Sequence, residues 1–304
     1  MQSIWGIDMG GTKIEGVVLE PGKTGFRELA RQRIPTEKEK GYDHIIQRVG
    51  GLIDQLKAQT GLQPKKIGMG TPGTLDPITQ LHKNANTTAL NGQPFKKDLE
   101  ERLGLSFTLA NDANCFAIAE AKMGAAVEGA PGAKLVFGVI MGTGVGGGIV
   151  FDGKVWNGRQ GIGGEWGHSF LDESGGVCYC GNLGCVETVI AGPALERYYR
   201  ELSGQTLSLQ EIVNRYGKQQ DEIADKTIKR LIHYFGKGMA NIINTLDPDA
   251  IILGGGLGNI SLLYTEGLEA IMPFLFNPRL DTIFLRPKLG DSAGVYGAAM
   301  LVAD

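Results

Sequence analysis

IWGIDMGGTKIEGVVLEPGK, residues 4–23, reads as a strand, a glycine-rich turn, a second strand and another turn. A similar stretch, LVFGVIMGTGVGGGIVFDGK, returns at residues 135–154. Two such hairpins about 135 residues apart predict a duplicated, two-lobed fold in which each lobe contributes one glycine loop to a shared cleft. The alternative is chance similarity between two hairpins that are both rich in glycine and valine.

Bulk composition narrows the class of protein. The chain has 304 residues, enough for two lobes at ~100–200 residues per domain. Its 30 basic and 33 acidic residues nearly balance, which argues against a nucleic-acid or membrane surface. The sequence has no apolar run of ~18 residues and no signal-peptide pattern, so we expect a cytoplasmic protein with reduced thiols. Glycine is the anomaly at 47 residues, about double its usual ~7% share, and it clusters between strand-like runs.

Hydrophobic periodicity predicts alternating strands and helices. Residues 42–60 carry apolar side chains at steps of three and four, as an amphipathic helix does. Short strands are expected at 3–7, 13–19, 66–69, 107–110 and from 250, and helices at 113–123, 193–203, 208–216, 219–246, 261–275 and from 293.

Three glycine loops follow predicted strands: 8–13, 141–148 and 254–256. Glycine lets backbone N–H groups approach phosphate oxygens closely, so three such loops together predict nucleotide binding. For any one loop, a plain tight hairpin is the alternative. The candidate nucleotide-binding residues are Asp8, Gly10, Gly11, Thr12, Lys13, Gly142, Thr143, Gly144, Gly254, Gly255 and Gly256, with Asp8 also a candidate ligand of Mg²⁺.

Asp112 lies where a predicted strand ends and a helix begins, in LANDANC. An acidic residue at this place caps a helix and interacts favourably with its dipole. The other interpretation is a general base that accepts a proton from an attacking hydroxyl. The two roles are compatible, and the sequence leaves both open.

Three of the four cysteines lie within eight residues, in CYCGNLGC, ten residues after a histidine. Three thiolates and one imidazole form a closed tetrahedral zinc site of the structural kind, so we predict zinc on His168, Cys178, Cys180 and Cys185. Free thiols are the alternative. Cys115 is too distant in sequence to assign to the site and is predicted to be a small buried residue.

The segments DMGGTK, GTPG, LANDANCFA, MGTGVGGG, GEWGH, CYCGNLGCVE, DPDAIILGGG and GDSAGVYGAA together resemble the ROK family of sugar kinases, from one end of the chain to the other. The resemblance implies an α/β fold of the actin/hexokinase ATPase type, with duplicated ribonuclease H-like domains and a zinc-stabilised loop. It places a smaller lobe at residues 1–113 plus 293–304 and a larger lobe with the zinc site at 114–292.

The resemblance also implies the chemistry. The expected reaction transfers phosphate from ATP, with Mg²⁺, to the 6-hydroxyl of a sugar, with Asp112 as the base and Zn²⁺ as a structural ion. The sugar-binding residues would be Gly73, Asn86, Asn111, Glu165, His168 and Glu187. We expect a homodimer whose partners are the sugar and ATP, with no nucleic acid and no membrane.

The preferred sugar is predicted from shorter likenesses. KNANTTALNGQPF and LANDANC are similar to segments of bacterial fructokinases, so fructose is the first expectation, with mannose or glucose also accepted. LANDANCFAIAEA and GTGVGGGIVFDGK also resemble N-acetylglucosamine kinases, which makes that sugar, or N-acetylmannosamine, the alternative. Two other classes remain open: a sugar-sensing ROK regulator without its DNA-binding domain, and an actin-like or chaperone ATPase.

Overall fold

The computed structural model describes residues 3–23, 25–219 and 221–303. Contacts between Cα atoms divide the chain into two compact units. Unit 1 comprises residues 1–138, 148–164 and 287–304, and unit 2 comprises residues 139–147 and 165–286. Three ranges that were predicted to lie in the larger lobe thus group with unit 1: residues 114–138, 148–164 and 287–292.

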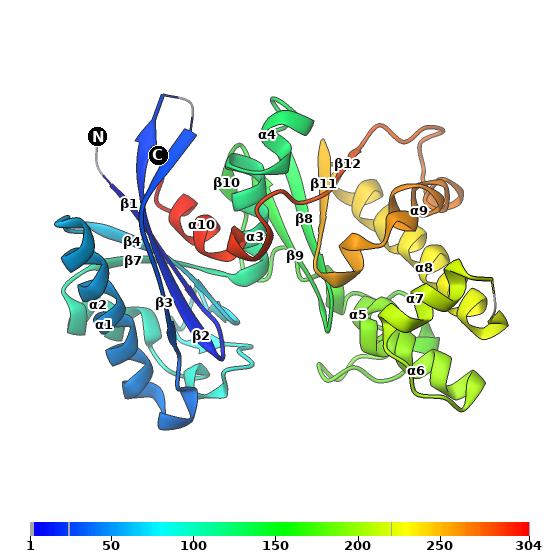
Figure 1. Ribbon diagram of the computed structural model, residues 1–304, viewed down its shortest axis with the longest axis horizontal. Helices are drawn as coiled ribbons and strands as arrows, with labels where there is room; N and C mark the ends of the chain where they lie inside the picture. The colour runs from blue at the N-terminus through cyan, green and yellow to red at the C-terminus, as the bar shows by residue number, and fades with distance from the viewer. Residues whose placement is uncertain (1–2, 24, 220, 304) are drawn as a thin grey trace. The chain divides into compact units, whose positions relative to one another are not determined.

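Unit 1 is organised around a five-stranded sheet with the order β3-β2-β1-β4-β7 (Figure 1). β1 pairs antiparallel with β2 and parallel with β4, and β4 pairs parallel with β7. The carboxyl ends of β1, β4 and β7 therefore meet at one edge, which is where ligands bind in open α/β sheets. The strands are β1 (Ile4–Met9), β2 (Lys13–Gly22), β3 (Gly25–Pro35), β4 (Lys66–Thr71) and β7 (Ser106–Asn111).

Helices cover both faces of this sheet. On one face lie α1 (Tyr42–Thr60) and α2 (Phe95–Leu103), and α1 buries the apolar stripe that the sequence predicted. On the other face lie α3 (Asp112–Lys122) and α10 (Ala293–Met300). The short α4 (Ala125–Gly129) follows α3 in the chain. Gly6 and Gly68 let α10 lie directly on the strands, because a Cβ at Gly68 would stand 1.8 Å from the Ala298 carbonyl oxygen. The two-residue strands β5 (Thr74–Leu75) and β6 (His82–Lys83) form a separate antiparallel pair.

A second sheet has the order β10-β9-β8-β11-β12. Its strands are β8 (Leu135–Met141), β9 (Val145–Phe151), β10 (Lys154–Val155), β11 (Ala250–Gly254) and β12 (Ile283–Leu285). β8 and β9 are the second predicted hairpin, and they lie next to one another in the sheet. Two sheets that each contain such a hairpin confirm the expected fold class.

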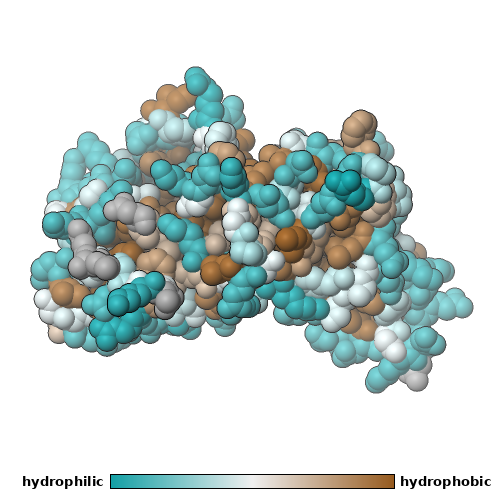
Figure 2. Space-filling model, turned by 90° about the horizontal axis from the view of Figure 1, so that it is seen from above, coloured by the Kyte–Doolittle hydropathy of each residue, from teal (hydrophilic) through white to brown (hydrophobic). Residues whose placement is uncertain are grey.

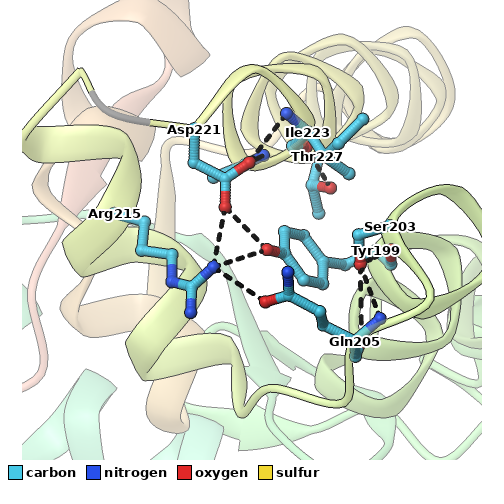
Figure 3. A network of polar contacts seen from close by, with 8 residues as sticks. Tyr199, Ser203, Gln205, Arg215, Asp221, Ile223 and Thr227 are labelled. Atoms are coloured by element: carbon cyan, nitrogen blue, oxygen red, sulfur yellow. Dashed lines mark hydrogen bonds and ion pairs between the residues drawn. The ribbon is translucent and has the colours of Figure 1, made fainter.

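The α-helices of unit 2 are α5 (Val186–Ile190), α6 (Gly192–Ser203), α7 (Leu209–Gly217), α8 (Glu222–Leu246) and the short α9 (Glu266–Glu269). A polar network joins three of them (Figure 3). The Tyr199 hydroxyl donates to Asp221 at 2.6 Å, and Arg215 donates to both Tyr199 and Asp221. Asp221 also accepts from the first N–H groups of α8, so one carboxylate both caps α8 and fixes α6 and α7 against it.

The predicted elements are found with small changes in their bounds, with one clear error. The predicted helix 261–275 is instead two short 3-10 helices, Ser261–Tyr264 and Met272–Phe274, with α9 between them. Thr265 has a non-helical backbone and Pro273 has no N–H to donate, so a continuous helix cannot form there. β3, α2 and β12 were not predicted.

No helix within the described residues is long and apolar enough to cross a membrane. Hydrophilic side chains are widely distributed over the face shown in Figure 2.

Candidate functional site

In unit 1, Asp8 lies near the end of β1 and is closely surrounded by glycines. A Cβ at Gly294 would stand 2.6 Å from Asp8 Oδ2, and one at Gly70 would stand 3.2 Å from Oδ1. Side chains at either position would take the space that the carboxylate uses. The two glycines, from α10 and β4, therefore leave room for Asp8 at the carboxyl edge of the sheet.

Asp8 has a second carboxylate close enough to repel it. Burial, followed by the charges of Asp112 and Glu15, raises the pKa of Asp8 to about 6. The Asp112 side chain reaches solvent, yet crowding by protein atoms raises its pKa too, against the hydrogen bond that it accepts from the Ala113 N–H at 2.9 Å. A cation would relieve this repulsion, so oxygen ligands and charge both fit Mg²⁺ at Asp8.

The start of α3 separates the two roles considered for Asp112. The N-cap is Asn111, whose side-chain oxygen accepts from the Asn114 N–H at 2.7 Å. Asp112 is the first residue of the helix. Asn111 therefore caps α3, and Asp112 does not supply the capping hydrogen bond.

The first glycine loop is a tight turn in which the Gly10 N–H donates to the Lys13 carbonyl at 2.9 Å. Two side chains that sequence reasoning missed lie at this loop. A Cβ on Gly11 would stand 3.3 Å from Lys38 Nζ and 3.5 Å from Thr87 Oγ1. The buried Thr87 hydroxyl has no hydrogen-bond partner within the described residues. An ammonium group and an unpartnered hydroxyl beside the partly buried Gly11 are suited to an anion. Lys38 and Thr87 are too far from the loop in sequence for sequence analysis to have predicted this.

In unit 2 the other two glycine loops lie together. A Cβ at Gly255 would stand 2.2 Å from the Met141 carbonyl oxygen, so the loops after β11 and β8 are in close contact. Gly255 has φ of +76°, a conformation that favours glycine. The Gly142 carbonyl accepts from the Gly192 N–H at 2.9 Å, which fixes the loop to the start of α6.

The four predicted zinc ligands converge in unit 2, with all their ligand atoms within 4.8 Å of one another. Cys180 Sγ and Cys185 Sγ are 3.6 Å apart, and Cys178 Sγ is 3.6 Å from His168 Nδ1. Tetrahedral zinc with bonds of ~2.3 Å to sulfur and ~2.0 Å to nitrogen requires separations of roughly 3.8 and 3.6 Å. The cluster therefore fits Zn²⁺. Cys115 is fully buried elsewhere, as expected.

The zinc segment, residues 165–187, carries the four predicted ligands and is fixed to the second glycine loop by two side chains. Glu187 Oε2 accepts from the Val145 N–H at 2.9 Å, and Trp166 Nε1 donates to the Gly146 carbonyl at 3.0 Å. A Cβ at Gly144 would stand only 2.6 Å from Glu187 Oε2. The sequence analysis assigned Glu187 to sugar binding only, and it did not predict the hydrogen bond from the Val145 N–H that joins the glycine loop to the zinc segment.

The remaining candidates are distributed over the two units. Gly73 has φ of +74°, and a Cβ there would stand 2.4 Å from the Lys83 carbonyl oxygen, so the turn after β4 requires glycine. Asn86 is exposed on the segment after β6. Glu165 is half-buried, three residues before His168. Unit 1 thus brings together Asp8, Asn111 and Asp112, and unit 2 the zinc ligands, Glu187 and two glycine loops.

Known proteins resemble the chain over its whole length. The sequence model described as the ROK family matches residues 4–304. An N-acetyl-D-glucosamine kinase of Aliivibrio salmonicida is 36% identical over 98% of each chain. A ROK hexokinase from Thermus thermophilus is 32% identical with a TM-score of 0.87, covering 99% of this chain and 97% of that one. A ROK family glucokinase from Streptomyces griseus, solved with glucose and AMPPNP, is 27% identical with a TM-score of 0.73 over 98% of each chain.

Proposed function

Because the chain belongs to the ROK family of sugar kinases, we propose that it transfers the γ-phosphate of ATP to the 6-hydroxyl of N-acetylglucosamine. The observation that carries the choice of sugar is the relationship to curated N-acetyl-D-glucosamine kinases, at 36% identity over 98% of each chain for the Aliivibrio protein. This supports the alternative among the sequence-based expectations better than fructose, the first of them. The short segments that favoured fructokinases cover far less of the chain.

The residues of unit 1 supply the proton chemistry. The Asp112 carboxylate accepts the proton of the 6-hydroxyl as that oxygen bonds to the γ-phosphorus, while the bond from the phosphorus to the bridging oxygen breaks and ADP leaves. Crowding by protein atoms raises the pKa of Asp112, which makes its carboxylate a stronger base. Since Asn111 caps α3, Asp112 is available for this role.

Asp8 would hold the magnesium ion. When bound, Mg²⁺ neutralises charge on the transferring phosphate. Lys13 and Lys38 place positive charge beside the first glycine loop, where backbone N–H groups can approach an anion. In this scheme Asp8 serves the nucleotide and not the sugar.

In unit 2, Glu165, His168 and Glu187 would bind sugar hydroxyls. Zinc would hold the histidine ring and the cysteine segment in place without entering the reaction. The glycine loops after β8 and β11 would contact the nucleotide. The contact from Glu187 to the Val145 N–H supports a coupling between sugar-binding and nucleotide-binding residues within this unit.

A turnover panel tests the proposal. Purified enzyme would be assayed with Mg·ATP and, separately, N-acetylglucosamine, N-acetylmannosamine, glucose, mannose and fructose. We expect the highest kcat/KM with N-acetylglucosamine. A preference for glucose would place the chain with the Streptomyces glucokinase instead, and one for fructose would restore the first expectation. No turnover with any sugar, despite sugar binding, would indicate a sensor.

A further inference from the structure

Tyr179 lies between two of the four zinc-ligand residues, Cys178 and Cys180, yet its side chain is 83% exposed. Its hydroxyl stands 3.0 Å from His168 Nε2, and the two rings meet edge to face with centroids 5.1 Å apart. An aromatic side chain with so little packing around it is not held by a core. The contact with the histidine is therefore the main feature that fixes its position.

The two nitrogens of His168 face different partners. Nδ1 is directed towards Cys178 Sγ, and hence towards the zinc position. A histidine that binds a metal through one nitrogen carries its proton on the other, so Nε2 is a hydrogen-bond donor. In this structure the acceptor of that bond is the Tyr179 hydroxyl, at 3.0 Å.

The same nitrogen is the one that a sugar can reach. Nδ1 is taken by the zinc, so a sugar oxygen must use the Nε2–H. The Tyr179 hydroxyl, 3.0 Å from His168 Nε2, is therefore in contact with the atom that the sugar is expected to bind.

We propose that the Tyr179 hydroxyl occupies, in the sugar-free enzyme, the hydrogen-bonding position on His168 that a sugar oxygen takes, and that sugar binding displaces it. This inference rests on the proposed function for the position of the sugar. The exposed ring can rotate into solvent without opening a cavity. Tyr179 is then a residue that sets sugar affinity by competing with the substrate for one donor.

The competition has a measurable consequence. Each sugar that binds must first replace a neutral hydrogen bond, and removing the competitor tightens binding by about 2–10-fold, the range of one such bond. The transferred phosphate and the base are not involved, so kcat stays within about twofold. A residue with a merely structural role would show the opposite pattern, with zinc content and turnover falling together.

The test compares wild type, Tyr179→Phe and a control, Tyr198→Phe. The control removes a hydroxyl from another tyrosine of unit 2, Tyr198, whose ring centroid lies 4.7 Å from the guanidinium carbon of Arg230. Calorimetry without ATP gives the Kd of N-acetylglucosamine, and of the best sugar in the panel if that differs. Steady-state kinetics give KM and kcat separately, elemental analysis gives zinc, and NMR of the histidine ring nitrogens follows Nε2 before and after sugar is added.

We expect Tyr179→Phe to lower Kd and KM by about 2–10-fold at one zinc per chain, with the His168 Nε2 resonance shifted before sugar is added. Tyr198→Phe should behave as wild type. A raised Kd would mean that the hydroxyl contacts the bound sugar, and an unchanged Kd would mean that it does not compete; either overturns the proposal. The turnover panel with the wild type tests which sugar is the substrate. The ratio of the Kd of Tyr179→Phe to that of the wild type tests the competition, so the proposed function and the proposed role of Tyr179 can fail independently.

Discussion

Replacing Asp112 with asparagine should separate the chemistry of this position from its structural role. The substitution keeps the size of the side chain and a carbonyl oxygen that can accept the Ala113 N–H, now 2.9 Å from Asp112 Oδ1. The cap of α3 stays intact, because Asn111 provides it. We therefore expect a melting temperature close to that of wild type.

The loss of activity should be large. A positioned general base contributes roughly 10²–10⁴-fold, which corresponds to about 2.7–5.5 kcal/mol in the activation free energy. An amide cannot take up the proton, so kcat should fall by that factor. The Kd of the sugar should change by less than about threefold, since the amide oxygen can still accept a hydrogen bond from the hydroxyl.

The assay is ADP formation coupled to NADH oxidation, with saturating Mg·ATP and the best sugar of the panel. Asp54→Asn is the matched control, because its side chain is 77% exposed on α1 and contacts only Lys57 among the ion pairs found in the described residues. It should keep full activity. If Asp112→Asn turned over within about threefold of wild type while folded, Asp112 would not be the base, and the proposed mechanism would lose its central residue.

Three further predictions follow from the site. Asp8→Asn should stabilise the magnesium-free protein at pH 7.5 by up to about 3 kcal/mol. Because folding raises the pKa of Asp8 from 3.8 to about 6, the folded state disfavours the ionised carboxylate, and the stability of the wild type falls as the pH rises through 6. Urea titrations at pH 3.5 should therefore show no difference in stability between the variant and the wild type. Elemental analysis should find one zinc per chain in wild type, and Cys180→Ser should lose most of it and weaken sugar binding; four titratable thiols in active, metal-free enzyme would refute the site. Gly144→Ala should raise the KM for ATP and cost roughly 1–3 kcal/mol of stability, since its Cβ displaces Glu187 from the Val145 N–H. Gly51→Ala is the control and should not be destabilised, because its φ, like that of Gly144, is not positive and a Cβ there meets nothing within 4 Å.

Features that depend on the local pattern of residues in the sequence were predictable. The helix at 42–60 was found with its bounds unchanged, because its apolar stripe is buried against one sheet face and Gly61 ends it with a positive φ. The convergence of His168 with the three cysteines was predictable because their spacing restricts the possible metal sites. The positions of Asp8 and Asp112 near strand ends were also predictable, and the parallel pairing of β1, β4 and β7 brings them to one edge of the sheet.

Features that depend on distant partners were not predictable. The polar residues of β3 gave no clear strand signal, yet Arg31 and Arg33 both pair with the buried Glu15 of the neighbouring β2. Lys38 reaches Gly11 only through the folding of the segment between β3 and α1. In each case the ion pair or close approach joins residues that are distant in sequence. Neither hydrophobic periodicity nor motif spacing predicts such a contact.

The exposure of apolar side chains in the zinc segment explains why a metal ion would stabilise it. Between Phe170 and Cys185 the large apolar side chains mostly face solvent: Val177 is 77% exposed and Leu183 49%. Apart from the bridges Phe170–Cys185 and Val177–Leu183, no strand pairing was found in the described part of this segment. With so little apolar surface buried, the hydrophobic effect contributes little to its order, and four bonds to one ion would replace the missing core. Because Glu187 lies two residues after Cys185 and accepts from the Val145 N–H, a zinc ion on this cluster would also help to set the geometry of the glycine loop that is predicted to bind the nucleotide.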